Sequence, residues 1–423
     1  MTAGVLFASV CAAAFYAELG GAFEGSLDHP SIAYQGPTND PVAALNRELL
    51  NGSVKLKFDE RTGYLRSVLD ALNVPVESQI VAVAKTSVQQ EIISPQNPRT
   101  LYFNDSVAVG YVRGGFMELA VQDVQRGMIF YTLGRDDSDP ESFSVVKGAI
   151  GATFRREYQC LNCHISYSSM GVPGMLLRSV FPAPNGIALY QAGSYVTDHR
   201  SPAVERYGGW YVTGESGPLR HMGNVLFTDA NKAAVPAKGQ IFSSLKTRLD
   251  TQLYLSPYSD IVALLVFDHQ MHMMNLLTRV GWEARYDRFE QPSTLAARMQ
   301  SAAEEFVDYL LFVDEAPLGG KIRGNSGFAE KFAAQGPKDS KGRSLRQFDL
   351  ENRLMRYPCS YMIYSEAFDG LPVEAKDAIY QRLWAVLSGK LSGGKYARLS
   401  PADRETVLQI LKETKKGLPK YMF

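Results

Sequence analysis

The feature that most constrains this chain is the run Cys160-Leu161-Asn162-Cys163-His164, in which two cysteines stand three residues apart and a histidine follows at once. On a helical turn, residues three apart lie on the same side, so both thiols would point in the same direction and could react with a single bound group. The imidazole of the histidine that follows would lie close to that same group. The chain has four cysteines and six histidines among 423 residues, so a chance occurrence of this spacing is a poor explanation.

Cys-x-x-Cys-His is typical of the covalent attachment of a c-type haem. Cys160 and Cys163 would form thioethers with the two vinyl groups, and His164 would coordinate the iron as its proximal ligand. The run occurs once and the chain has no internal repeat, so we expect one haem c. A zinc site and a thiol redox pair are the alternatives, although the other cysteines, Cys11 and Cys359, form no second pair.

Arg155 and Arg156 precede the motif and are our candidates for contacts with the haem propionates; solvated surface arginines are the alternative. The sixth iron ligand is open in the sequence. Our first candidate for the distal ligand is His221, which follows an aromatic and glycine-bearing stretch suited to folding over a ring. The alternatives are Met222, His269 and His272. We interpret His199, beside Asp198 and Arg200, as a solvated loop residue.

Four further stretches accompany the motif: SPQNPRTLYFND (94–105), GVPGMLLRSVFP (171–182), GGWYVTGESGPLRHMGN (208–224) and YPCSYMIYSEAF (357–368). With these blocks the chain resembles the secreted cytochrome c domain-containing proteins of bacteria, over most of its length. The resemblance implies a cofactor but no reaction. Only Cys160, Cys163 and His164 carry over, from the general cytochrome c pattern.

Charge and composition indicate an ordinary folded protein, for which we expect neither nucleic-acid binding nor a membrane span. Lysine plus arginine equals aspartate plus glutamate at 44 each, so no net charge attracts nucleic acid. We expect no transmembrane segment in the mature chain. Residues 1–17 are small or apolar, which indicates a truncated secretion signal cleaved near Ala14 or Ala17. Covalent haem attachment takes place outside the bacterial cytoplasm, so we expect a periplasmic or otherwise exported protein.

The pattern of apolar residues predicts a mixed α+β fold. Asp40 should cap a helix over 41–50, and runs at 106–112, 116–121 and 128–133 predict a small antiparallel meander. From 258 to about 289, after a cap at Ser256, we expect a helix buried on all sides. Further helices are predicted at 295–312, 327–334, 348–356, 372–387 and 401–415.

We therefore divide the chain into the signal segment (1–17), an N-terminal helix and strand region (18–98), the meander with the haem-binding segment (99–250) and a mostly helical region (251–423). The expected function is electron transfer with an unidentified redox partner protein. A plain carrier needs only about a quarter of this chain, so the helical half should serve a partner or substrate. The alternatives are a haem oxidoreductase, such as a peroxidase with an open sixth position, and a structural module built around its haem.

Overall fold

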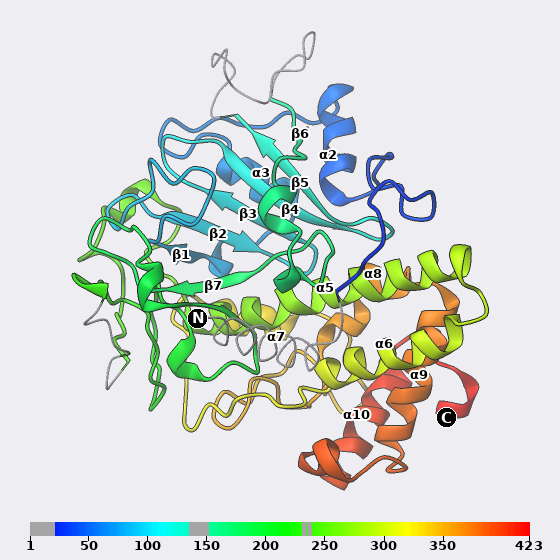
Figure 1. The fold of residues 1–423 in the computed structure, drawn as a ribbon. Helices are drawn as coiled ribbons and strands as arrows, with labels where there is room; N and C mark the ends of the chain where they lie inside the picture. The colour runs from blue at the N-terminus through cyan, green and yellow to red at the C-terminus, as the bar shows by residue number, and fades with distance from the viewer. Residues whose placement is uncertain (1–21, 135–151, 231–234, 236–238) are drawn as a thin grey trace, which may run out of the picture.

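The computed structural model describes residues 22–134, 152–230, 235 and 239–423. The predicted signal segment and Cys11 lie outside these ranges. The fold is mixed α+β, with an antiparallel sheet at one end and a group of helices at the other (Figure 1). Within the described ranges, no helix is long and apolar enough to span a bilayer.

The main sheet has seven antiparallel strands in the order β6-β5-β4-β3-β2-β1-β9. The predicted meander is confirmed as its centre, and flanking strands extend it on both sides. The strands are β1 (Ile80–Ala82), β2 (Arg99–Phe103), β3 (Val107–Tyr111), β4 (Met117–Asp123), β5 (Gly127–Leu133), β6 (Arg155–Arg156) and β9 (Trp210–Tyr211). A separate pair is formed by β7 (Leu177–Val180) and β8 (Ser194–Thr197).

The sheet separates two apolar cores because alternate residues of each strand point to opposite faces. One face, which includes Tyr102, Val109 and Ile129, packs with α2 (Pro41–Leu50) and α3 (Leu65–Ala71). The other face, which includes Phe103 and Phe130, joins the larger core around α5 (Ile261–Glu290). The predicted cap of α2 is confirmed, since Asp40 accepts hydrogen bonds from the first amides of the helix.

Helix α5 is buried along most of its 30 residues, as predicted, but its cap is not Ser256. Asp260 caps it instead: Oδ1 accepts hydrogen bonds from the amides of Val262 (2.8 Å) and Ala263 (3.2 Å). Its Oδ2 accepts hydrogen bonds from the amides of Asn325 (2.7 Å) and Ser326 (2.9 Å). The fully buried Asp260 therefore links the start of the helix to a loop 65 residues further along the chain.

Of the helices that follow α5 in the chain, α6 (Leu295–Leu310), α7 (Phe328–Ala334), α8 (Glu366–Asp369) and α9 (Val373–Leu387) pack against it, and α10 (Pro401–Thr414) packs against α9. Residues 348–356 are not the predicted helix. Asp349 accepts hydrogen bonds from the amides of Glu351 and Asn352, and Leu350 takes a positive φ of 58°, so this segment turns back on itself.

Replacing Asp260 by alanine should lower the free energy of unfolding by at least about 3 kcal/mol, because four amides, two of them buried and two part-buried, lose their acceptor. The matched control is Ser400→Ala at the exposed start of α10, where loss of one cap should cost about 1 kcal/mol. Urea unfolding of the two variants measures the difference. Equal losses would contradict the central role given to Asp260.

Candidate functional site

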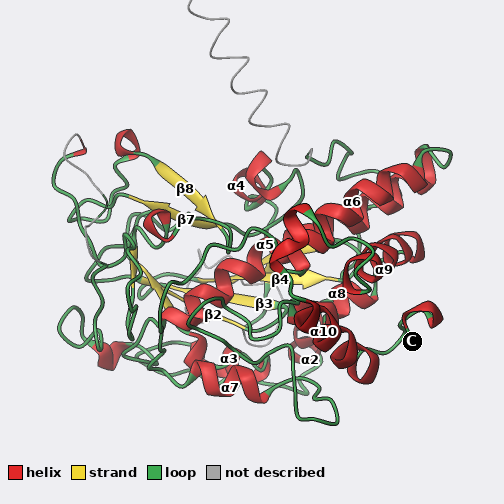
Figure 2. Ribbon diagram, turned by 90° about the horizontal axis from the view of Figure 1, so that it is seen from below, coloured by secondary structure: helices red, strands yellow, loops and turns green. Residues whose placement is uncertain are grey.

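The predicted motif lies on one helical turn, α4 (Leu161–His164). The carbonyl of Cys160 accepts hydrogen bonds from the amides of Cys163 (3.2 Å) and His164 (2.9 Å), so all three residues belong to the same turn. Both cysteines carry free thiols; Cys160 is half-buried and Cys163 is exposed. Seen from below, α4 and the β7–β8 pair lie on the same side of α5 (Figure 2).

The imidazole of His164 is held in one tautomer. Its Nδ1 lies 2.8 Å from the carbonyl oxygen of Gly174, which can only accept, so Nδ1 carries the hydrogen and Nε2 has the lone pair. Burial lowers the pKa of His164 below its ordinary value. Within the described residues, Nε2 has no hydrogen-bond partner. A neutral imidazole fixed through Nδ1 to a backbone carbonyl is the arrangement that metal-ligating histidines use.

Helix α5 holds the loop that carries this carbonyl. Asn275 accepts a hydrogen bond from the amide of Met175 (3.0 Å) and donates one to its carbonyl (2.8 Å). A Cβ at Gly174 would lie 2.3 Å from Oδ1 of Asn275, so only glycine fits here. The amide of Gly174 also donates to the carbonyl of His164 (2.9 Å). The acceptor for His164 is therefore fixed from two sides.

The ring of His164 lies 4.7 Å from that of Phe130, on the sheet face that packs towards α5. Two residues after Phe130 on β5, the same face of the sheet becomes polar. Thr132 lies opposite Glu118 of β4, and the Thr132 hydroxyl donates a hydrogen bond to Glu157. Burial, followed by the nearby carboxylates of Glu118 and Glu157, raises the pKa of Cys160 to about 12.

The two arginines predicted to meet the propionates have partners in the protein. Arg155 forms an ion pair with Glu157 (3.0 Å). Arg156 donates to the carbonyls of Gly36 (2.9 Å) and Tyr34, and its guanidinium lies over the Tyr34 ring at 4.9 Å. Arg156 therefore anchors the N-terminal segment to the sheet, and contacts of either arginine with a propionate stay a prediction.

Of the distal candidates, His221 and Met222 are fully buried. Nδ1 of His221 accepts a hydrogen bond from the amide of Gly223 (3.1 Å), which places the ring hydrogen on Nε2. That Nε2 is buried without a hydrogen-bond partner among the described residues. Met222 packs with Phe181 and Phe227, and its sulfur lies 3.9 Å from the hydroxyl of Ser179.

The other two candidates, His269 and His272, have both ring nitrogens next to protein groups. Nδ1 of His269 lies 2.7 Å from Nδ1 of His199, and its Nε2 lies 2.7 Å from the hydroxyl of Ser360. Nε2 of His272 accepts a hydrogen bond from Arg200 (3.2 Å), and its Nδ1 lies 3.8 Å from Asp198. In this arrangement neither imidazole offers a nitrogen to a metal.

The prediction that His199 is a solvated loop residue is wrong, because only 2% of it is exposed. Asp198 and Arg200 pair with each other at 2.6 Å near the surface, while the His199 ring turns inward and stacks on Tyr309 at 4.1 Å. His199 belongs to a buried polar cluster that also contains His269, Asp268, Arg206 and Thr197. Arg206 lies 3.5 Å from the Asp268 carboxylate, and the Thr197 hydroxyl donates a hydrogen bond to it at 2.8 Å.

Sequence reasoning missed this cluster and Asn275, although one signal was available. Asp268, His272, Asn275 and Arg279 recur at spacings of four, three and four, which places them on one face of α5. A polar stripe on an otherwise apolar helix indicates that this face meets polar partners inside the protein. That face meets the segment from Met170 to Arg200, which follows the motif.

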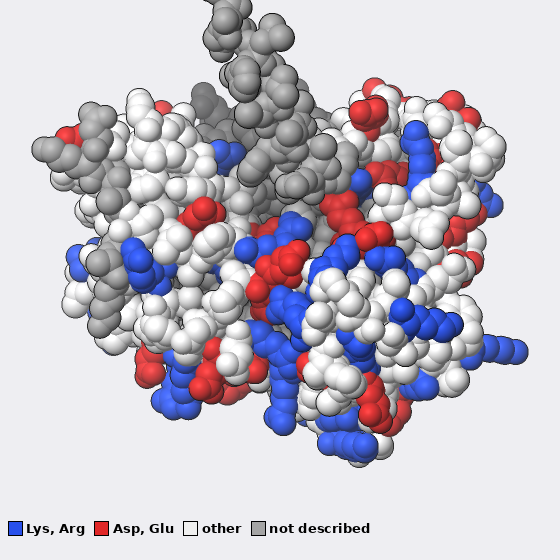
Figure 3. All heavy atoms as spheres, turned by 60° about the horizontal axis from the view of Figure 1, so that its bottom comes forward, with Lys and Arg blue, Asp and Glu red and all other residues white. Residues whose placement is uncertain are grey.

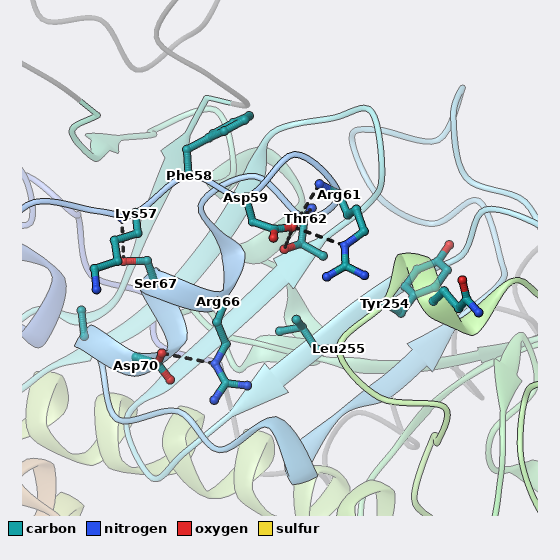
Figure 4. Close-up of a pocket in the computed structure, with 12 residues that line it drawn as sticks. Lys57, Phe58, Asp59, Arg61, Thr62, Arg66, Ser67, Asp70, Tyr254 and Leu255 are labelled. Carbon is teal, nitrogen blue, oxygen red and sulfur yellow. Dashed lines mark hydrogen bonds and ion pairs between the residues drawn. The ribbon is translucent and has the colours of Figure 1, made fainter.

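A surface hollow of about 730 Å³ lies apart from the motif, beside α3 on the opposite face of the sheet (Figure 4). Its charged walls pair with one another: Arg66 with Asp70 at 3.2 Å, and Arg61 with Asp59 at 3.9 Å. All four of these charged side chains are exposed.

Comparisons with family models, with curated proteins and with solved structures found no match for this chain.

Replacing His221 by glutamine should remove one source of acid sensitivity. Burial lowers the pKa of His221 to about 4, so the folded state keeps the ring neutral while the unfolded chain binds a proton below about pH 6.5. The free energy of unfolding therefore decreases as the pH falls from about 6.5 towards about 4, and His221 accounts for about 2 kcal/mol of this loss between pH 7 and pH 5. Urea unfolding at the two pH values should show a correspondingly smaller loss in the variant. Equal losses in both proteins would indicate that the ring is held by an interaction other than those described.

Proposed function

We propose that the protein binds one haem c through Cys160, Cys163 and His164 and transfers electrons in an exported, periplasmic compartment. The observation that carries the proposal is the hydrogen bond from Nδ1 of His164 to Gly174, which leaves Nε2 with its lone pair on the same turn as two free thiols. When bound, the haem iron supplies a one-electron couple. The chain supplies a fixed neutral imidazole and two anchoring sulfurs.

The surroundings of the motif fit an attachment edge that reaches the surface. Cys163 is exposed, and Tyr158 and Tyr167, which precede and follow it in the chain, are 44% and 41% exposed. Outer-sphere electron transfer requires only that a redox partner protein comes close to such an edge. Among the described residues on the face drawn in Figure 3, acidic and basic side chains are interspersed.

A haem oxidoreductase with an open sixth position is the second candidate, and the distal geometry favours it. Apart from Met1, the residues outside the described ranges include no histidine or methionine. His269 and His272 are engaged by protein groups, His221 carries its hydrogen on Nε2, and Met222 is packed between phenylalanines. Each of the four predicted distal ligands would therefore have to give up these contacts before it could bind the iron.

The exported protein should keep its pigment when it is denatured in acid and acetone, and its mass should include one haem. The variant Cys160→Ala,Cys163→Ala should lose both, because no thioether can form. Cys359→Ala is the matched control, since this buried thiol has no role in attachment, and it should keep the haem. Pigment that washes out of the unaltered protein would contradict the proposal.

The visible spectrum of the reduced protein separates the two candidate functions. A low-spin spectrum insensitive to carbon monoxide indicates a saturated iron and an electron carrier. A high-spin spectrum changed by carbon monoxide indicates the open position of an oxidoreductase and would contradict the role of a plain electron carrier. His221→Ala should leave the spectrum unchanged; a conversion from low to high spin would instead identify His221 as the distal ligand.

A further inference from the structure

An ion pair lies on the sheet beside the motif and has no part in attaching the haem. Arg99 of β2 and Glu118 of β4 meet across Gly110 of β3, with Nε of the arginine 3.0 Å from Oε2 of the glutamate. A Cβ at Gly110 would lie 2.7 Å from the guanidinium, so glycine lets Arg99 lie against the middle strand. The hydroxyl of Ser87 donates to both carboxylate oxygens at 3.2 Å.

The strand register brings this pair next to His164 and Cys160. Glu118 lies opposite Thr132 on β5, and Phe130, which contacts the His164 ring, lies two residues away on the same face. Thr132 in turn donates to Glu157, three residues before Cys160. Both charges of the pair act on the imidazole and on the thiol.

Water screens these two charges only in part. The Arg99 side chain is 21% exposed and that of Glu118 is 19% exposed. Charges at this depth interact through a medium of lower effective dielectric constant than water, so their field extends over several ångströms. The two fields oppose each other at the motif while both residues are charged; Arg99 has the larger effect on His164, and Glu118 has the larger effect on Cys160.

We propose that Arg99 and Glu118 are opposed electrostatic residues that set the reduction potential of a redox centre held by His164. This inference rests on the proposed function and adds the residues that adjust it. Positive charge near an iron disfavours its oxidised form, and negative charge favours it. Arg99 alone would therefore raise the potential, and Glu118 alone would lower it.

The test is a double-mutant cycle on the mature haem protein, read as the midpoint potential by spectroscopic titration. Glu118→Gln leaves Arg99 uncompensated and should raise the potential. Arg99→Gln leaves Glu118 uncompensated and should lower it. The double variant should return close to the unaltered value. Arg353→Gln is the matched control, because the Arg353–Asp403 pair is equally buried (24% and 19%) but lies at the start of α10; its potential should not change.

A purely structural role predicts a different pattern, in which both single variants move the potential in the same direction or not at all. Either result would overturn the proposal, as would an equal shift in Arg353→Gln. Should the exported protein carry no covalent haem, the proposed function fails. The effect of the ion pair is then measured on the haem-free protein as the rate at which Cys160 is alkylated, which peptide mass spectrometry follows. Glu118→Gln should speed the reaction and Arg99→Gln should slow it, and equal rates would overturn the pair's role.

Discussion

Helix α5 imposes the constraint on which the rest of the structure depends. It is buried along most of its length, so each of its polar side chains has to find a partner inside the protein. Asp260 holds the loop at 325–326, His269 meets His199 and Ser360, and Asn275 holds Met175. The most buried helix of the fold therefore also fixes the loops that follow the motif.

The state of His164 follows from this constraint. Asn275 fixes the backbone around Gly174, the Gly174 carbonyl takes the Nδ1 hydrogen, and Nε2 keeps its lone pair. The core therefore holds the His164 ring in a fixed position, while Cys160 is half-buried and Cys163 is exposed.

The sheet supplies the electrostatic surroundings of the same site. Its α5-facing surface is apolar at Phe103 and Phe130, then polar at Glu118, Thr132 and Arg99. The charges beside Cys160 and His164 are therefore set by strand register, and each has a partner that offsets its cost of burial.

The sequence by itself determined the elements that have local signals. These are the α2 cap at Asp40, the three strands of the meander, the helices α9 and α10, and the helical turn that carries Cys160, Cys163 and His164. Each depends on residues a few positions apart, whose spacing is visible in the printed chain.

Only the tertiary structure decided which groups meet across long separations. It moved the α5 cap to Asp260, turned His199 into the core, let Asp349 convert a predicted helix into a turn, and joined Arg99 to Glu118 over Gly110. The reason is physical: burial forces each polar group to take the partner that the packing of distant segments provides, and no local spacing specifies that partner.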